Sequence, residues 1–322
     1  MFNETISRID KIVSRINTHP EYSSCVATET SRSLRLEAEK HSLDIELIGE
    51  KKRLTKKQKK NFLNNLDEAW GLLRREGISR FSLSQLGPIV EPKNNPTGSF
   101  RNLQTSFGGF FPTEQESIPY EIESLIYFLE SSKTHPVVRA SNAHLEMVRI
   151  HPYNDGNGRA ARLLQNFCLM QRGYPPAIMP SKERKDYIQM MGNVLRGRYN
   201  LETDLENQSE AEIEFHNFIA SKVLSSALIL EKELKSRRMY EINLSHVADP
   251  STPRSLAYRI RKIGRNSQGV RSGISVKILQ NGNKKSCKLE VMGDVGSEEL
   301  DKAISQVSEK RKFKHSLDKK HF

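Results

Sequence analysis

The stretch that decides the fold is His151-Pro-Tyr-Asn-Asp-Gly-Asn-Gly-Arg-Ala-Ala-Arg162. Helical apolar spacing over residues 136–149 precedes it, and a second helical pattern covers residues 159–172, so the stretch joins two helices. Residues 156–158 therefore stand where a helix begins. Backbone N–H groups at a helix start are unpaired and carry partial positive charge, and glycine lets the backbone approach an anion closely. The stretch is thus predicted to bind a phosphate group.

Charged side chains flank this predicted helix start. Arg159 and Arg162 are three positions apart, so they share a helix face and can reach one phosphate chain with forked, permanently charged donors. Asp155 offers a hard carboxylate oxygen, the ligand type that Mg²⁺ uses beside nucleotide phosphates. His151 titrates near neutral pH and can serve as a general base. Together these groups predict phosphoryl or nucleotidyl transfer, which depends mainly on positioning and charge stabilisation.

The stretch resembles the signature of the Fic family, His-x-Phe-x-Asp/Glu-Gly-Asn-Gly-Arg-x-x-Arg. It differs at one defined position, where Tyr153 replaces Phe. Tyr keeps the ring that anchors the loop in the core, but its hydroxyl needs a hydrogen-bond partner. Residues 98–101 (Gly-Ser-Phe-Arg), 135–150 and 184–187 are similar to the family's early strand, preceding helix and later helix. The resemblance covers about residues 80–200.

The resemblance implies a protein adenylyltransferase, which moves AMP from the donor ATP to a Ser, Thr or Tyr hydroxyl of a target protein. His151 would deprotonate that hydroxyl, which then attacks the α-phosphorus, and Asp155 would hold Mg²⁺. The α- and β-phosphates would be contacted by Gly156, Asn157 and Gly158.

The family also implies roles for two arginines and a flap. Arg159 would neutralise the leaving pyrophosphate, and Arg162 would bind the γ-phosphate. A flap over residues 103–111 would clamp the target backbone by adding a strand, a docking mode that tolerates many sequences. Its docking residues would be Thr105, Ser106, Phe107, Gly108 and Gly109. A plain surface hairpin is the alternative for this segment.

A built-in inhibitor is expected before the catalytic core. Ser33-Leu-Arg-Leu-Glu37-Ala38 resembles the family's inhibitory motif, Ser/Thr-x-x-x-Glu-Gly/Asn, as in its class II members, but departs from it at Ala38. The resemblance implies that Ser33 and Glu37 lie on an inhibitory helix and that Glu37 pairs with Arg162 in the γ-phosphate site. An ordinary charged helix with an i, i+4 contact is the alternative.

The predicted fold is mainly α: a Fic-type helical core with a short β-hairpin flap, followed by a small α+β module. The expected parts are an N-terminal helical region with the inhibitory motif (1–78), the catalytic core (79–238), the basic module (241–309) and a disordered tail (310–322). Helices are expected near 1–18, 33–40, 55–75, 119–129, 136–149, 159–172, 181–196 and 210–235, with loop or hairpin over 82–111. In the module we expect helices at 253–263 and 297–308, and strands at 273–279 and 286–292 joined by a turn at 281–282.

Composition narrows the class of protein. The 322 residues are 36% hydrophobic and 28% charged, which suits a folded chain. Three widely spaced cysteines make a disulfide framework or a cysteine-based metal site improbable and indicate a reducing compartment. No apolar run approaches the roughly 20 residues of a membrane span, and the N-terminus has no apolar signal region. The expected location is the cytoplasm, with no membrane partner.

Positive charge concentrates in two segments of a chain whose net charge is +12. Residues 241–322 hold 17 Lys+Arg against 9 Asp+Glu, a balance of 17 − 9 = +8, and residues 51–60 hold seven basic residues and no acidic one. Residues 51–60 would suit nuclear import if the protein were secreted into a host cell. In the module, a basic stripe that could lie along one helix comprises Arg254, Arg259, Arg261, Lys262 and Arg265. They could bind nucleic acid or an acidic protein. Alternatively, the module could be a docking or homodimerisation unit on which these residues form a solubilising surface.

Two functional classes therefore stand. The alternative to the transferase is a nucleic-acid or chromatin-associated binding protein with a regulatory nucleotide site, which would have no need of the base His151. Within the enzyme class, transfer of phosphocholine or UMP is compatible with the signature. A kinase-like Doc relative is disfavoured, because it would carry Lys where Gly158 stands.

Overall fold

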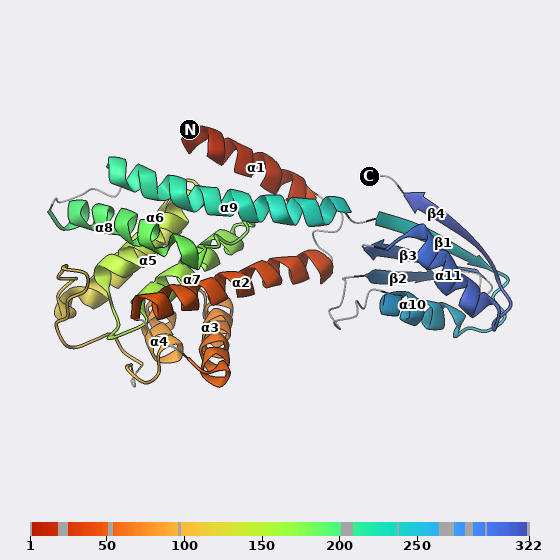
Figure 1. Cartoon of the computed structure of the whole chain (residues 1–322), viewed down its shortest axis with the longest axis horizontal. Helices are drawn as coiled ribbons and strands as arrows, with labels where there is room; N and C mark the ends of the chain where they lie inside the picture. The colour runs from red at the N-terminus through yellow and green to blue at the C-terminus, as the bar shows by residue number, and fades with distance from the viewer. Residues whose placement is uncertain are drawn as a thin grey trace. The chain divides into compact units, whose positions relative to one another are not determined.

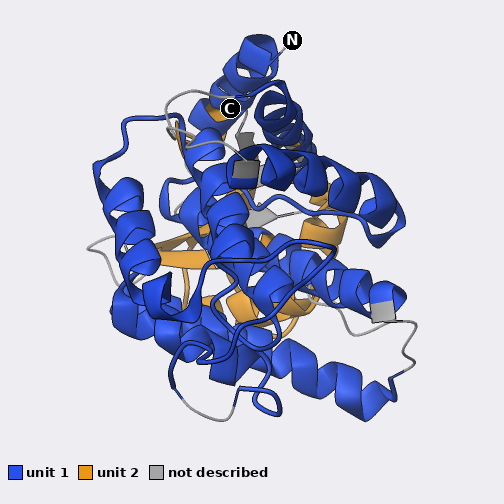
Figure 2. Cartoon of the chain, turned by 90° about the vertical axis from the view of Figure 1, so that its left-hand side faces the viewer, with its two compact units in different colours: residues 1–14, 31–228 blue, residues 15–30, 229–322 orange. Residues whose placement is uncertain are grey.

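The computed structural model of the chain describes residues 2–18, 25–50, 54–95, 98–200, 209–236, 238–263, 274–280, 286–293 and 295–320. The chain divides into two compact units: unit 1 comprises residues 1–14 and 31–228, and unit 2 comprises residues 15–30 and 229–322 (Figure 2). Unit 1 is helical and unit 2 contains the sheet. The prediction of a mainly α chain with a small α+β part is confirmed.

Nine α-helices precede the sheet in the described part of the chain (Figure 1). They are α1 (Phe2–Thr18), α2 (Cys25–Glu50), α3 (Lys56–Glu76), α4 (Arg80–Val90), α5 (Ile118–Ser131), α6 (Pro136–Ile150), α7 (Asn157–Gln171), α8 (Arg184–Asn200) and α9 (Glu210–Ser236). Short 3₁₀ turns at Gln115–Ser117 and Ser181–Glu183 lead into α5 and α8.

Helices α6 and α7 form the centre of unit 1. They pack along each other, and nearly every residue of both is buried. A helix that is buried on all sides needs other helices around it, and α3, α4, α5 and α8 contact this pair. The loop that joins α6 to α7, residues 151–156, is therefore held at both ends by the core.

The segment predicted as loop or hairpin over residues 82–111 is helical in its first part, because α4 spans Arg80–Val90. Ser79 caps this helix by accepting from the backbone N–H of Ser82, and Leu83 and Leu86 are fully buried. Pro88 and its neighbouring glycine argued against a helix. The free energy gained by burying the apolar side of three helical turns exceeds the loss of helix stability caused by these two residues.

The long helix α9 passes a simple test for a membrane span. Among the described helices it alone is long and apolar enough, over Glu210–Leu234, to cross a membrane by length and composition. Core helices of soluble proteins pass the same test. Phe215, Ile219 and Val223 of α9 are fully buried in the core of unit 1, so packing explains part of its apolar character.

The part of unit 2 that follows α9 contains a four-stranded antiparallel sheet and two helices. Its elements are β1 (Arg238–Ser245), α10 (Thr252–Ile263), β2 (Ser275–Gln280), β3 (Ser286–Gly293), α11 (Ser297–Ser308) and β4 (Lys314–Lys320). The strand order is β2-β3-β1-β4, which with the β-α-β-β-α-β chain order gives the ferredoxin-like arrangement. Tyr240, Ile242 and Leu244 of β1 alternate with polar residues and pack against α10 and α11 in a second core.

Two strands of this sheet were absent from the sequence prediction. β1 follows α9 after a single residue, and β4 covers most of the tail that was predicted to be disordered, so that prediction is wrong for residues 314–320. The alternating pattern of β4 is weak because the strand lies at the sheet edge and carries mostly polar residues. The predicted turn at 281–282 and Arg265 lie outside the described residues.

Candidate active site

The signature loop begins and ends in left-handed backbone. His151 ends α6 with φ 52°, and Gly156 precedes α7 with φ 85°. A positive φ favours glycine, so Gly156 suits its position, whereas His151 is held there by its surroundings. Asn157 closes the loop between them, since its side chain accepts from the N–H of Tyr153 (2.9 Å) and donates to the carbonyl of Tyr153 (2.8 Å).

Tyr153 anchors the loop in the core. Its ring is 1% exposed, and its hydroxyl donates to the backbone carbonyl of Leu83 in α4. The ring lies against Gly87, where an added Cβ would come within 2.5 Å of it. A Tyr at the Phe position of the signature requires a hydrogen-bond partner for its hydroxyl. Helix α4, which sequence analysis missed, supplies that partner.

Asn95, which sequence analysis also missed, fixes the outer side of the loop. Its amide donates to the carbonyl of Asp155 (2.9 Å) and accepts from the N–H of Asn154 (2.9 Å). The neighbouring Asn94 donates to the Asp155 carboxylate (2.7 Å). Nothing in the sequence pattern marks these residues, because their role depends on a turn after α4 that meets a loop 60 residues away.

The imidazole of His151 lies under the flap. Its ring stacks on Phe107 with centroids 4.1 Å apart and an interplanar angle of 12°. Burial lowers the pKa of His151 to about 4, against a backbone hydrogen bond to Val148 that raises it, and the nearby Arg101 lowers it further. The ring is thus neutral at physiological pH, the protonation state that a general base requires.

Arg101 connects the flap to the loop. Its Nε donates to the carbonyl of His151 (2.8 Å), and its two terminal nitrogens donate to the carbonyl of Leu103, the first flap residue, and to that of Thr113, just after the flap. The Arg101 N–H also bonds to the Pro152 carbonyl (2.8 Å), although residues 98–101 form no regular strand.

The flap is a hairpin of one residue pair. Phe107 and Phe110 exchange backbone hydrogen bonds of 3.1 and 2.8 Å, and both intervening residues, Gly108 and Gly109, have positive φ. A two-residue turn with positive φ at both central positions favours Gly, Asn or Asp there, and two glycines adopt it without steric cost. Thr105 and Ser106 precede the pair without joining a strand, so the predicted hairpin is confirmed at its shortest possible length.

The first signature arginine is held from two sides. Nη1 of Arg159 donates to Glu91 (2.9 Å), and Nη2 lies 3.4 Å from Oδ1 of Asp155, while the guanidinium lies over the ring of Phe62. The side chain is 5% exposed. Glu91, the residue that follows α4, is a further group that sequence analysis missed.

The second signature arginine pairs with α2. Nη2 of Arg162 lies 2.5 Å from Oε1 of Glu46, Nε donates to the Ser42 hydroxyl (2.8 Å), and Nη2 also reaches the Ser42 carbonyl (3.2 Å). On its other side, Nη1 donates to the hydroxyl of Tyr187 (3.3 Å), which is bonded to His144 (2.8 Å). Arg162 is thereby fixed in a buried network.

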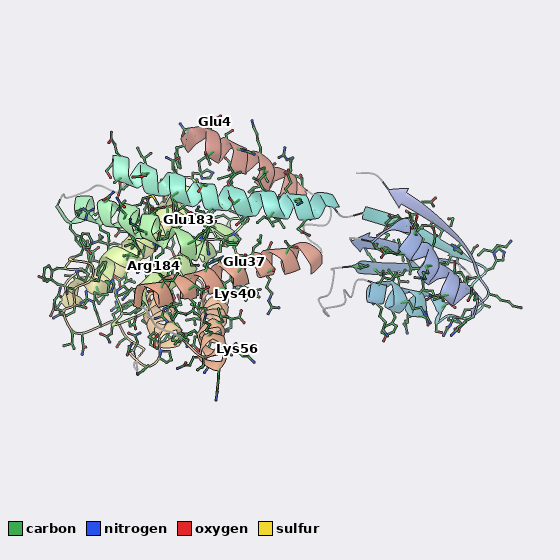
Figure 3. All side chains as sticks on the ribbon, viewed as in Figure 1. Glu4, Glu37, Lys40, Lys56, Glu183 and Arg184 are labelled. Carbon is green, nitrogen blue, oxygen red and sulfur yellow. The ribbon has the colours of Figure 1, made fainter. Side chains whose placement is uncertain are left out.

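This geometry corrects the predicted inhibitory contact. Glu37 and Ser33 are exposed on α2, where Glu37 can be followed in Figure 3, and the partners of Arg162 are Glu46 and Ser42 instead. Glu46 is nine positions after Glu37, which is about 2.5 turns at 3.6 residues per turn, so the two side chains project from opposite sides of the helix. Ser42 and Glu46, the residues that contact Arg162, have the same Ser-x-x-x-Glu spacing, and Leu47 follows them where the family's motif has Gly or Asn.

The Glu46 carboxylate rests on the start of α7. A Cβ added at Gly158 would lie 2.8 Å from Oε1 of Glu46 and 3.2 Å from Nη1 of Arg162. Unpaired N–H groups and the helix dipole at this end favour a negative charge. An anionic oxygen therefore already occupies the place where sequence analysis expected a phosphate.

Asp155 can serve as a ligand for Mg²⁺. Its carboxylate is 36% exposed and accepts from the Gly156 N–H (2.5 Å), so its oxygens face the helix start. The described residues contain no cluster of three acidic, histidine or cysteine side chains for an all-protein metal site. One carboxylate fits an ion held jointly by nucleotide phosphates and water.

Comparison with known proteins agrees with this geometry, since residues 76–169 match the Fic/DOC family. The chain contains a Fic domain. Protein adenylyltransferase Fic of Drosophila grimshawi is 39% identical over 97 residues, and protein adenylyltransferase fic-1 of Caenorhabditis elegans is 38% identical over 93 residues. These matches cover 29% and 28% of this chain and 20% and 18% of those proteins, so the chain spans about a fifth of the relatives' length.

Solved Fic structures share the fold. A Fic-domain signalling protein from Bacteroides thetaiotaomicron superposes with a TM-score of 0.59 at 18% identity, over 72% of this chain and 97% of that one. Fic-1 of C. elegans (residues 134–508) gives 0.58 at 20% identity, over 73% of each chain. A Fic family protein from Desulfovibrio desulfuricans gives 0.56 at 16% identity, over 94% of this chain and 83% of that one.

Proposed function

We propose that this chain is a protein adenylyltransferase that transfers AMP from ATP to a hydroxyl of a target protein and is restrained by Glu46. The observation that carries the proposal is the Glu46 carboxylate, bound by Arg162 at the start of α7. The site thus binds an anionic oxygen beside a loop whose base, His151, is neutral. The curated relatives named above, which are called adenylyltransferases, support the same activity.

The mechanism follows from the positions of the side chains. Neutral His151 would accept the proton of the target's Ser, Thr or Tyr hydroxyl while that oxygen attacks the α-phosphorus and pyrophosphate leaves. The N–H groups at the start of α7, over Gly156, Asn157 and Gly158, would bind the phosphates. Mg²⁺ held by Asp155 would neutralise part of the negative charge of the phosphates. The exposed flap edge around Phe107 would position the target backbone.

The two signature arginines would have to change partners when a triphosphate binds. Arg162 would exchange Glu46 for the γ-phosphate, because one forked cation cannot bind both anions in the same geometry. Arg159 would exchange part of its contact with Glu91 for the leaving pyrophosphate. Restraint would therefore arise from competition between the Glu46 carboxylate and the γ-phosphate for Arg162 and the start of α7.

A matched pair of variants tests this proposal. Glu46→Ala and Glu37→Ala remove the same group from one helix without loss of helix propensity. After incubation with Mg²⁺ and ATP, we expect Glu46→Ala to gain the mass of one AMP, or to label proteins in an extract from α-labelled ATP, at least about tenfold faster than the parent. Glu37→Ala should behave as the parent, and Glu46→Ala/His151→Ala should transfer nothing.

Each departure from this pattern has a defined meaning. Equal rates for Glu46→Ala and the parent would remove Glu46 from the restraint. A mass gain of UMP or phosphocholine from the corresponding donor would replace AMP in the proposal. Nucleotide binding without transfer to any protein would favour a regulatory nucleotide site, the alternative class set out from the sequence.

A further inference from the structure

Helices α10 and α11 lie side by side on one face of the unit 2 sheet (Figure 1). Each is amphipathic: α10 buries Leu256 and Ile260 against the strands, and α11 buries Leu300 and Ile304. Their opposite sides face away from the sheet. A hollow of about 770 Å³ lies over the seam between them.

The hollow is strongly basic. Its lining includes five cationic side chains, Arg259, Lys262, Lys302, Lys310 and Arg311, against one acidic side chain, Glu299. These cations come from both helices and from the turn after α11. Sequence analysis placed a basic stripe on α10 alone, but the structure divides it: Arg261 turns away to donate to the Val276 carbonyl (2.7 Å).

Several of these cations are available to a ligand. Lys302 and Lys310 are exposed, and neither forms an ion pair with any residue that the structure describes. Arg259 donates to the neutral amide of Gln306 (2.8 Å), which leaves its charge uncompensated. Arg311 is paired with Asp249 (2.5 Å) and so contributes less. The net field over the seam is therefore positive.

The same hollow has an apolar component. Tyr258 is 60% exposed and projects from α10 beside Lys262, whose ammonium lies 4.6 Å from its ring centroid. Half-buried Ile263 and the buried edges of Ala303 and Val307 complete the apolar lining. An exposed aromatic ring and aliphatic floor between two rows of cations favour a ligand that is both apolar and acidic.

We propose that this groove binds an acidic, amphipathic segment of a partner protein. A peptide helix or extended strand with one apolar side could place that side on Tyr258, Ile263 and Val307. Its carboxylates would then face Lys262, Lys302 and Lys310. The proposal goes beyond the transfer reaction, because the groove belongs to unit 2 and requires neither nucleotide nor His151.

Single-stranded nucleic acid fits the groove less well. Binding of that kind relies on several aromatic side chains that stack successive bases, whereas the groove offers Tyr258 alone, with Lys262 over its ring. The outer face of the sheet gives no substitute, because its described residues include no aromatic side chain on which a base could stack; they include Glu241, Asn243, Lys277, Lys288 and Glu290. Phosphate attraction by the lysines remains as an outcome that the experiment can detect.

Binding of defined probes to the full chain tests the proposal. The probe is a fluorescein-labelled peptide of Glu with Leu and Phe at positions i, i+3, i+4 and i+7, compared with polyglutamate and with a 12-nucleotide single-stranded DNA and RNA. Fluorescence anisotropy should show binding of the amphipathic peptide that weakens with salt. Polyglutamate should bind at least about fivefold more weakly, because it lacks apolar side chains to contact Tyr258.

Variants locate the site. Lys302→Glu/Lys310→Glu should weaken peptide binding at least about tenfold, and Tyr258→Ser about threefold or more. The control, Lys56→Glu/Lys57→Glu, makes the same charge change on exposed lysines of α3, where Lys56 is labelled in Figure 3, and should leave binding unchanged. Equal melting temperatures would show that these surface changes preserve the fold.

Three results would overturn the proposal. They are absence of peptide binding at low salt, equal weakening by the α3 control, and tighter binding of DNA or RNA than of the amphipathic peptide. None of these results bears on the transfer reaction, which is measured separately by mass gain, so failure of one proposal leaves the other standing.

Discussion

Phe107 of the flap stacks on the imidazole of His151, so the pKa of this ring reports the position of the flap. Burial lowers the pKa of His151 to about 4, from 6.5 for a free side chain, so the neutral form persists down to about pH 5. Because the native state disfavours the proton, His151 costs stability as the pH falls from 6.5 through 4. Phe107→Ala should expose the ring and raise its pKa toward 6.5.

NMR titration of histidine-labelled protein would measure this shift, with the His151 signal assigned by its loss in His151→Gln. His144 provides an internal control: burial lowers its pKa to about 3, and its partners are Gln165 and Tyr187, not the flap. Its signal should not move in Phe107→Ala. A His151 ring that titrates near 6.5 in the parent protein would contradict the packed flap.

At the scale of one helix, α2 shows that the residue spacing of a motif does not identify its contacts. The side of the helix on which the motif lies must also be known. Two Ser-x-x-x-Glu stretches occur on it, Ser33–Glu37 and Ser42–Glu46, and both have the spacing of the inhibitory motif. Leu34, Ala38 and Ile45 are buried, but whether a given polar residue lies beside Arg162 depends on how α2 packs across α7. That packing is tertiary, so helical periodicity alone could not decide between the two pairs.

The same helix carries a buried carboxylate with a measurable pH signature. Glu39 is 6% exposed, is bonded to Arg35, and has an Oε2 that no described residue contacts by hydrogen bond. Burial raises the pKa of Glu39 to about 7, although Arg35 opposes the rise. The native state therefore holds a proton that the unfolded chain releases above pH 4.5. The stability due to this proton is lost as the pH rises from 4.5 through 7.

Glu39→Gln should remove this dependence. Relative to the parent, the variant's free energy of unfolding should rise between pH 5 and pH 8, by at most about 3 kcal/mol. Guanidinium unfolding at pH 5, 6, 7 and 8 measures the difference. The exposed Glu37→Gln, on the same helix, should give a constant difference over this range. Parallel pH profiles for Glu39→Gln and the parent would show that Glu39 is ionised in the native state.

For the whole molecule, the sequence predicted most of the helices and the residues of the signature loop. Strong apolar periodicity was sufficient to predict helices α6, α7 and α9 from the sequence. The sequence pattern did not predict α4, because Pro88 within it argued against a helix although the helix is capped. It did not predict β4 either, because the polar residues of β4 are as typical of a disordered tail as of an edge strand. The partners of the signature residues, Glu46, Glu91 and Asn95, were missed because each comes from a distant segment and makes a contact that only tertiary packing creates.

The two cores use separate parts of the chain, which predicts separate responses to mutation. Every member of the unit 2 core lies between Tyr240 and Leu317, and no residue of the unit 1 core lies beyond 224. Ile242→Ala and Leu164→Ala each remove a fully buried aliphatic side chain and should cost about 2–5 kcal/mol. In hydrogen exchange measured by mass spectrometry, Ile242→Ala should raise exchange over 238–320 and Leu164→Ala over the core helices of unit 1. Faster exchange in both units from either variant would show that the two cores unfold together.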